Sequence, residues 1–164
     1  MMWDILSTIS EMLSASAVLA TLVYLAIQTR QSARAVQAST RQEILASDQQ
    51  FIMYAASNPE IELIRYKSHL SDEEKIRLGF FLTTFVRIRE NNWFQHKNGV
   101  LDDATWDTYR RSVIIVLGPA SARNWWRYIS SVGTYNPEFV SEVSKALAAA
   151  PVQQESRLLK AFDE

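Results

Sequence analysis

The stretch that decides the fold is residues 5 to 27, which read ILSTISEMLSASAVLATLVYLAI. This run contains neither proline nor glycine, and its single charged residue is Glu11. At about 1.5 Å per residue, a helix of this length reaches roughly 34 Å, which is enough to cross a hydrocarbon core of about 30 Å. The run therefore predicts a transmembrane helix.

The residues around this run favour an uncleaved anchor over a secretory signal. A signal peptide begins with a basic segment, whereas the first 25 residues contain no lysine or arginine. Arginines follow the run instead, at Arg30, Arg34 and Arg41, and no acidic residue precedes Glu43 on that side. The positive-inside rule then predicts a single-pass protein of the bacterial inner membrane, with its N-terminus outside and its C-terminal domain in the cytoplasm.

Polar residues within the run leave a second interpretation open. A core helix of a soluble bundle could carry the same hydroxyl groups and the same single carboxylate. Trp3 and Tyr24 favour the anchor, because they lie about 31 Å apart on a helix and match the two aromatic belts of a membrane.

Composition limits both the fold and the partners. The net charge is −1, from 17 basic and 18 acidic residues that are intermixed, so nothing indicates nucleic acid as a partner. There is no cysteine, which excludes disulfides, thiolate metal sites and a cysteine nucleophile. Only four glycines and four prolines interrupt 164 residues, which favours long helices.

The predicted fold is all-α, with a long N-terminal helix that continues from the membrane into the cytoplasm and packs against a bundle of about five shorter helices. The expected division is a transmembrane anchor over residues 1–28, a helical cytoplasmic domain over 29–151 and a loosely ordered tail over 152–164. Capping and breaking signals place the helix boundaries at Asn58-Pro59, Ser71 with Glu74, Asn98-Gly99, Asp102 or Asp103, Gly118-Pro119, Ser121, Pro137 and Pro151.

Apolar side chains at helical spacing predict the core of this bundle. In the helix that starts at Ser71, the expected core residues are Ile76, Phe80, Phe81, Phe85 and Ile88. The later helices are expected to bury Trp106, Tyr109, Val113, Val116, Leu117, Trp125, Tyr128, Ile129, Val132, Phe139, Val140, Val143 and Leu147.

Two stripes run along the predicted long helix on opposite faces. The first stripe is small and polar, and its polar members are Ser7, Glu11, Ser14, Thr21, Gln28, Ser32, Ser39 and Gln42. Polar side chains in a membrane tend to face protein or water, so we expect this stripe to contact other copies of the chain. The second, more apolar stripe is expected to dock on the chain's own domain; it comprises Ala33, Val36, Thr40, Ile44, Ser47, Phe51 and Tyr54.

Glu11 has two interpretations in such an oligomer. A ring of Glu11 carboxylates from several copies would resemble the acidic rings of cation channels. Alternatively, Glu11 lies among the lipid headgroups with its charge in water, where the dipole of the helix start stabilises it.

A polar patch interrupts the aromatic helix that begins at Ser71. It consists of Glu90, Asn91, Asn92 and Gln95. The patch could line a polar pocket, or it could form a hydrogen-bonded network in the core, with Arg87 or Arg89 as the partner of Glu90.

The sequence carries no recognisable catalytic, cofactor or metal site. It has no nucleophile elbow, phosphate-binding loop or dinucleotide-binding glycine pattern. The two histidines, His69 and His96, are not part of a Glu-x-x-His pair, so a ferritin-like di-iron site is excluded. We expect no cofactor, no metal and no enzymatic activity.

Residues 28 to 39 read QTRQSARAVQAS, a Q-x-R-Q-x-x-R-A-x-x-A-S pattern that follows the hydrophobic helix. This arrangement resembles a group of uncharacterised bacterial membrane-anchored helical proteins. The resemblance implies a membrane-anchored helical protein and supplies no activity. Later motifs match in the same order: Glu90-Asn91 before an aromatic cluster, Gly99-Val-Leu-Asp-Asp with Trp106 downstream, Trp125-Trp126, and Asn136-Pro137-Glu138-Phe139.

Two classes of function follow from these patterns. In the first, a single-pass protein contacts membrane lipid and self-associates as a homo-oligomer. It acts as a scaffold or as an accessory subunit of a membrane-protein partner, and in one version the oligomer forms a pore. In the second, a soluble or peripheral helical domain binds a small apolar ligand or a regulatory partner. A requirement for detergent distinguishes the two classes.

Overall fold

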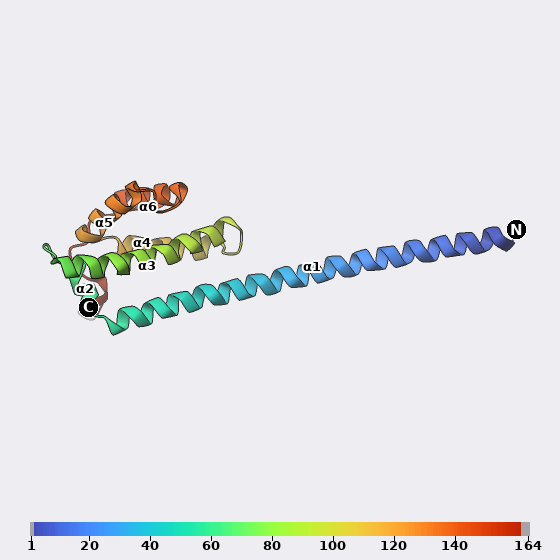
Figure 1. The fold of residues 1–164 in the computed structure, drawn as a ribbon, viewed down its shortest axis with the longest axis horizontal. Coiled ribbons are helices and arrows are strands. Elements are labelled where there is room, and N and C mark those ends of the chain that lie inside the picture. The colour runs from blue at the N-terminus through green and yellow to red at the C-terminus, as the bar shows by residue number, and fades with distance from the viewer. Residues whose placement is uncertain (1, 162–164) are drawn as a thin grey trace. The chain divides into compact units, whose positions relative to one another are not determined.

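The computed structural model describes residues 2 to 161, except for the side chains of residues 4 to 10. Over residues 2 to 161 the chain forms seven α-helices and no β-strand (Figure 1). The predicted all-α fold with one long N-terminal helix and a set of shorter helices is confirmed. The helices are α1 (Met2–Ser57), α2 (Glu60–Ile64), α3 (Asp72–Lys97), α4 (Asp103–Val116), α5 (Ala120–Ser131), α6 (Pro137–Ala149) and α7 (Arg157–Lys160).

The chain divides into two compact units, and the boundary falls inside α1. Unit 1 is Met1–Gln42, and unit 2 is Glu43–Glu164. Unit 1 is helix throughout its described residues. Unit 2 contains the remainder of α1 and all six shorter helices, so the last turns of α1 are part of the bundle.

Local capping signals start α3, α4 and α6 where the sequence predicts, whereas α5 begins at Ala120 after Pro119 and the expected cap Ser121 donates instead to the Arg65 carbonyl. At the start of α3, the Ser71 hydroxyl accepts from the Glu74 backbone N–H at 3.2 Å, and the Glu74 carboxylate accepts from the Ser71 N–H at 3.0 Å. Asp102 caps α4 by accepting from the Thr105 N–H at 2.8 Å. Asn136 caps α6, which begins with a proline. These caps satisfy N–H groups that have no partner within the helix.

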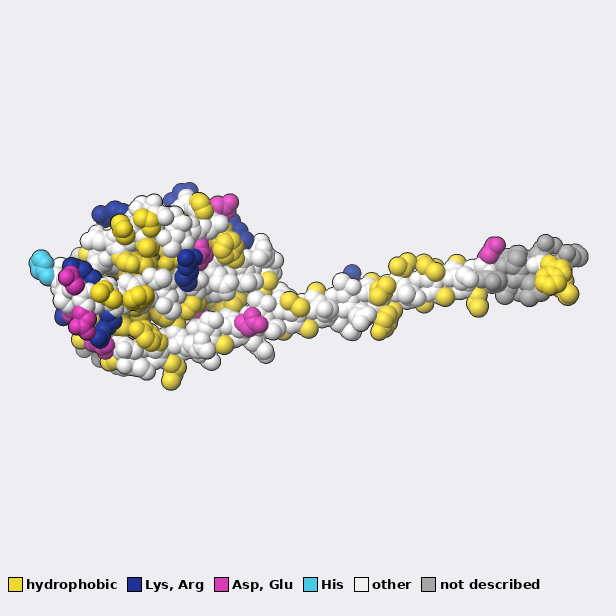
Figure 2. Space-filling model, in the orientation of Figure 1, with side chains coloured by type: hydrophobic (Ala, Val, Ile, Leu, Met, Phe, Trp, Pro, Cys, Tyr) yellow, Lys and Arg dark blue, Asp and Glu magenta, His cyan; other side chains and the backbone are white. Residues whose placement is uncertain are grey.

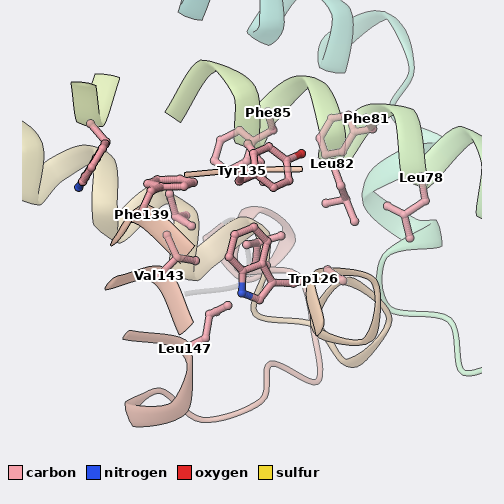
Figure 3. Close-up of a cluster of buried hydrophobic side chains, with 14 of the residues drawn as sticks. Leu78, Phe81, Leu82, Phe85, Trp126, Tyr135, Phe139, Val143 and Leu147 are labelled. Carbon is pink, nitrogen blue, oxygen red and sulfur yellow. The ribbon is translucent and has the colours of Figure 1, made fainter. Parts of the chain in front are cut away.

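One hydrophobic core holds unit 2 together. The indole of Trp126 lies among side chains from α3 and α6 (Figure 3), with ring centroids 5.8 Å from Tyr135 and 6.3 Å from Phe139. Phe139 and Phe85 are the largest fully buried side chains. The other buried members include Ile61, Ile64, Leu78, Phe81, Leu82, Val86, Trp93, Trp106, Val113, Leu117, Ala122, Val143 and Leu147.

Four side chains expected in the core are exposed instead. They are Ile76 and Phe80 on α3, Tyr128 on α5 and Val132 directly after α5; Phe80 is 70% exposed. Neighbouring residues of a helix point about 100° apart, so only one of two adjacent aromatic residues can face the centre of the core. The prediction was therefore right for Phe81 and wrong for its neighbour Phe80, and it named Trp125, which is half-buried, where Trp126 is the buried member of its pair.

The second stripe of α1 docks on the bundle within unit 2. Ile44 is 3% exposed. The ring of Phe51 packs at 5.0 Å from Phe81 and 5.3 Å from Phe85, measured between centroids. Farther toward the N-terminus, in unit 1, Val36 is exposed. Within unit 2, the predicted stripe packs most deeply at Ile44 and Phe51, Ser47 is half-buried, and Tyr54 is 45% exposed.

The segment after Pro151 makes specific contacts with the bundle. The Gln153 backbone N–H donates to the Gly118 carbonyl at 3.1 Å, and the Gln153 side-chain amide donates to the Ile114 carbonyl at 3.3 Å. Ser156 is buried; its hydroxyl donates to Glu62 and caps α7. Two polar side chains therefore attach this segment to α2 and to the end of α4.

A pair of glycine substitutions tests this packing. A Cβ at Gly118 would lie 2.4 Å from the amide nitrogen of Gln153, so Gly118→Ala is expected to displace Gln153 and to lower the free energy of unfolding by about 1–3 kcal/mol. A Cβ at Gly79, inside α3, would meet only the Trp125 indole nitrogen, at 3.9 Å. Gly79→Ala is therefore expected to stabilise the protein by about 0.5–1 kcal/mol. Urea unfolding followed by tryptophan fluorescence measures both; destabilisation of similar size in the two variants would contradict the packing described.

Candidate functional site

The apolar part of α1 is the candidate site of largest extent. Between Glu11 and Arg30 the helix carries no charged residue. An 18-residue window of α1 has a mean hydropathy of 1.6, and none of its residues is buried. By length and composition, this helix near the N-terminus is long and apolar enough to cross a membrane. Figure 2 shows hydrophobic side chains exposed along this helix. The exposed large hydrophobic residues of the segment are Met12, Leu13, Val18, Leu19, Leu22, Val23, Tyr24, Leu25 and Ile27.

Hydroxyl groups in this segment find their hydrogen-bond acceptors within the helix. Ser16, Thr21 and Thr29 each donate to the carbonyl oxygen four residues earlier, at 2.8 Å. A hydroxyl in hydrocarbon is costly mainly when it lacks such a partner. These three hydroxyl groups, of which Ser16 and Thr21 were among the polar residues that favoured a soluble core helix, are therefore compatible with lipid.

The small and polar stripe keeps its side chains exposed on α1. Ser7 belongs to the residues whose side chains the structure does not describe. In unit 2, the continuation of the stripe at Ala46 and Gln49 is exposed, whereas Ile44 is buried. Within unit 2, the shorter helices therefore leave this face of α1 uncovered at Ala46 and Gln49. The exposed members of the stripe in unit 1 are Glu11, Ser14, Thr21, Gln28, Ser32, Ser39 and Gln42.

The three arginines of α1 share a different face of the helix from this stripe. At 100° per residue, Arg34 and Arg41 lie within about 40° of Arg30 around the axis. Ser32 and Ser39 lie roughly 180–200° from Arg30. Unit 1 thus carries its positive charge on one side and its small polar residues on the other.

The structure divides the predicted polar patch of α3 into buried and exposed members. Glu90 and Asn92 are buried, Gln95 is half-buried, and Asn91 is exposed. The Glu90 carboxylate accepts a hydrogen bond from the Arg87 guanidinium at 2.9 Å. It accepts a second one, at 2.6 Å, from the backbone N–H of Asn136, the residue that precedes α6. Glu90 therefore fixes the start of α6 against α3.

Asn92 belongs to a second network, centred on Arg89. The Arg89 guanidinium donates to the Asp48 carboxylate at 2.8 Å, and to the amide oxygen of Asn92 at 2.9 Å when that oxygen is turned toward it. It also lies 4.7 Å from the Tyr109 ring and 4.9 Å from the Phe85 ring. Asp48 is on α1, so the network ties α1 to α3 and α4.

Burial shapes the electrostatics of this network. Removal from water lowers the pKa of the Arg89 guanidinium below its ordinary value, and the nearby Asp48 carboxylate opposes that shift. Burial, followed by the charge of Asp48, raises the pKa of the Tyr109 phenol. The phenol is therefore neutral at pH 7, and Arg89 and Asp48 form the charged pair.

Sequence reasoning missed a third cluster, around Glu142 of α6. The two carboxylate oxygens of Glu142 accept from the indole N–H of Trp93 at 3.0 Å and of Trp106 at 2.8 Å. The Trp106 ring stacks on His96 at 5.9 Å between centroids, and His96 Nε2 lies 2.8 Å from Asp103. No spacing rule pairs Glu142 with indoles 49 and 36 residues away, so the sequence held no local signal for this cluster.

Loss of the Glu142 carboxylate would leave two indole N–H groups without an acceptor. Glu142→Ala is expected to lower the free energy of unfolding by about 2–4 kcal/mol, because each buried unpaired donor costs about 1–3 kcal/mol. Lys145→Ala is the control, since Lys145 is an exposed residue on the same helix. Urea unfolding compares the two variants. Equal stability of Glu142→Ala and the control would show that the indole contacts do not hold α6 in place.

The three clusters of unit 2 connect its helices to one another. The Glu90, Asp48 and Glu142 carboxylates are each engaged by donors of the chain itself. Among the described residues, no group of three or more His, Asp and Glu side chains is placed to hold a metal ion. No protein-family model, curated protein or solved structure matches this chain.

Proposed function

We propose that the chain is a single-pass membrane protein anchored by residues 12–29 of α1. The exposed, uncharged apolar segment of α1 supports this proposal most directly. Burial of one large hydrophobic side chain contributes about 1.5–3 kcal/mol, so nine such side chains together favour a lipid environment by more than about 10 kcal/mol. The hydroxyl groups bonded within the helix reduce the opposing cost.

The proposed orientation places the N-terminus outside and unit 2 in the cytoplasm, across a bacterial inner membrane. Arg30, Arg34 and Arg41 follow the apolar segment, whereas Asp4 and Glu11 are the charged residues on its other side. Basic residues next to a span are retained in the cytoplasm, which supports this orientation.

The proposed role is that of a self-associating scaffold or accessory subunit. Small and polar residues allow helices to approach closely in a membrane, and the stripe of α1 supplies such a face. The arginines lie on a different face, so copies that meet through the stripe do not bring these like charges together. An oligomeric pore is one version of this role.

The native mass of the full-length chain in a mild detergent micelle tests self-association. We expect a defined multiple of the 18.8 kDa chain, and aggregation when the detergent is removed. Ser32→Trp, on the stripe, is expected to lower the multiple, while Val36→Trp, off the stripe, is expected to preserve it. A single chain per micelle would contradict self-association, and a monodisperse wild-type protein without detergent would contradict the anchor.

The pore version makes a prediction at Glu11. If the carboxylates of several copies ring a cation pathway, Glu11→Gln is expected to lower cation over anion selectivity several-fold in planar bilayers, because the ring loses its negative charge. Gln28→Glu, which adds a carboxylate on the same stripe, is the matched control and is expected to raise that selectivity. A wild-type protein without conductance at defined oligomeric mass removes the pore and places Glu11 among the headgroups.

The alternative role is a soluble or peripheral helical domain that binds a small apolar ligand, and an observation in unit 2 supports its ligand-binding part. A groove of about 410 Å³ with apolar walls opens beside the end of α1. This size is within the range of small-molecule sites in proteins. The groove lies in unit 2 and does not depend on the anchor, so ligand binding is compatible with either role.

A further inference from the structure

The apolar groove of unit 2 is lined by four helices, α1, α2, α3 and α7, and by the loop after α1. Ile52 and Ala56 come from α1, Leu63 from α2, and Leu158 and Leu159 from α7. The groove lies wholly within residues 52 to 159.

Small side chains make the groove hollow, and buried ones give it a firm floor. Ala55 and Ala56 leave room where larger residues would fill the space. Ile61, 1% exposed, and Phe81, 5% exposed, form part of the floor and belong to the main core. Ile52 is exposed at the edge of this concave surface, so apolar area is left in contact with water.

The helical turn α7 is held over this groove by one serine. The Ser156 hydroxyl donates to Glu62 and accepts from the first N–H groups of α7, at Leu158 and Leu159. Arg65 occupies the other oxygen of Glu62. The acidic residue of the lining is thus already paired, so the groove presents hydrocarbon and no free negative charge.

Positive charge accompanies the leucines of α7. Arg157 and Lys160 are exposed and flank the two leucines on the same turn. Lys160 also pairs with the exposed Glu155 at 3.2 Å, so Arg157 is the main source of this charge. Long basic side chains can extend their charged ends along an apolar surface while the end group stays in water. A ligand that suits this surface therefore combines a hydrocarbon chain with an anionic end.

We infer that this groove binds a single-chain carboxylate amphiphile, that is, a fatty acid. Its hydrocarbon chain would lie between α1, α2 and α7, in contact with Ile52, Leu63 and Leu158. Its carboxylate would remain at the rim within reach of Arg157 and Lys160. The inference is independent of the proposed membrane anchor, because unit 2 forms the whole groove.

Photolabelling of the full-length chain tests this site. The chain is placed in phosphatidylcholine nanodiscs and treated with dodecanoate that carries a diazirine at the end of its chain. Peptide mass spectrometry is expected to find saturable labelling around Ile52, Leu63 and Leu158, which unlabelled dodecanoate displaces. Ala56→Trp fills the groove and is expected to lower this labelling at least about tenfold, equivalent to 1.4 kcal/mol. Ala148→Trp, at an exposed alanine of α6, is the control and is expected to leave it unchanged.

A second pair of experiments tests the role of the ligand's carboxylate and controls for misfolding of the blocking variant. Arg157→Ala with Lys160→Ala is expected to weaken dodecanoate labelling several-fold, while labelling by a diazirine dodecanol is expected to stay the same. If Ala56→Trp loses its helical circular dichroism, Leu158→Asp replaces it, since Leu158 is 63% exposed. Groove labelling that survives a folded blocking variant, or labels confined to residues 12–29, would overturn the assignment. Equal effects on dodecanoate and dodecanol would overturn the choice of a carboxylate.

Discussion

Asp48→Ala is expected to lower the free energy of unfolding of unit 2 by about 3–5 kcal/mol. The reason is the position of its partner: Arg89 is 7% exposed and would keep a buried positive charge without a counter-ion. The loss would also free the end of α1 from α3. Urea unfolding of the full chain in mild detergent, followed by tryptophan fluorescence, measures the effect, because four of the five tryptophans lie in unit 2.

Two comparisons make the Asp48 result specific. Asp107→Ala removes an exposed pair with Arg110 and is expected to cost less than about 1 kcal/mol. Asp48→Asn combined with Arg89→Met removes both charges and is expected to cost less than Asp48→Ala alone, because no uncompensated charge remains. Equal stability of Asp48→Ala and Asp107→Ala would contradict the buried ion pair.

Leu19→Arg is expected to lower the equilibrium for membrane insertion of α1 by about 100-fold. An arginine at the centre of a span costs about 2.5–3.5 kcal/mol on insertion scales, and 1.4 kcal/mol corresponds to a factor of ten. Leu19 is 63% exposed on α1, so the substitution disrupts little packing. The fraction of protein that resists alkaline extraction from membranes measures insertion.

The matched control for Leu19→Arg lies on the same helix, beyond the arginines. Val36 is also 63% exposed, and Val36→Arg is expected to leave insertion unchanged, because this position lies outside the proposed span. Equal extraction of the two variants would show that the apolar segment does not reside in hydrocarbon.

Local signals made much of the fold predictable. The Ser71 capping box and the Asp102 cap act on N–H groups three residues away, so a short window of sequence contains the whole interaction. The long helix was predictable for the same reason, since no proline or glycine interrupts α1. The opposite faces of α1 also followed from helical geometry, because Ile44 is buried where Ala46 is exposed.

Contacts between distant residues set the limit of this prediction. The Asp48–Arg89 pair joins residues 41 positions apart, and each of the two looks in isolation like an ordinary surface charge. Adjacent aromatic pairs were ambiguous, since hydrophobicity cannot state which of Phe80 and Phe81 faces the core. That choice depends on where α4 to α6 pack, which no short window contains.

The same limit applies to the candidate sites. Glu90 was singled out as polar in an aromatic helix, yet its partner at the start of α6 is 46 residues away. The apolar groove combines α1, α2 and α7, and the sequence alone treats α7 as part of a tail. The apolar segment of α1 is different, because its length and composition are properties of a single helix.

Chemical labelling of single cysteines tests the membrane anchor most directly, and the chain contains no native cysteine to interfere. Leu19→Cys and Ser39→Cys are exposed to a membrane-impermeant maleimide in right-side-out and inside-out vesicles. We expect Ser39→Cys to react only in inside-out vesicles, and Leu19→Cys to react in neither until the membrane is dissolved and the protein denatured. Reaction of Leu19→Cys in intact vesicles at the rate of Ser39→Cys would contradict the account.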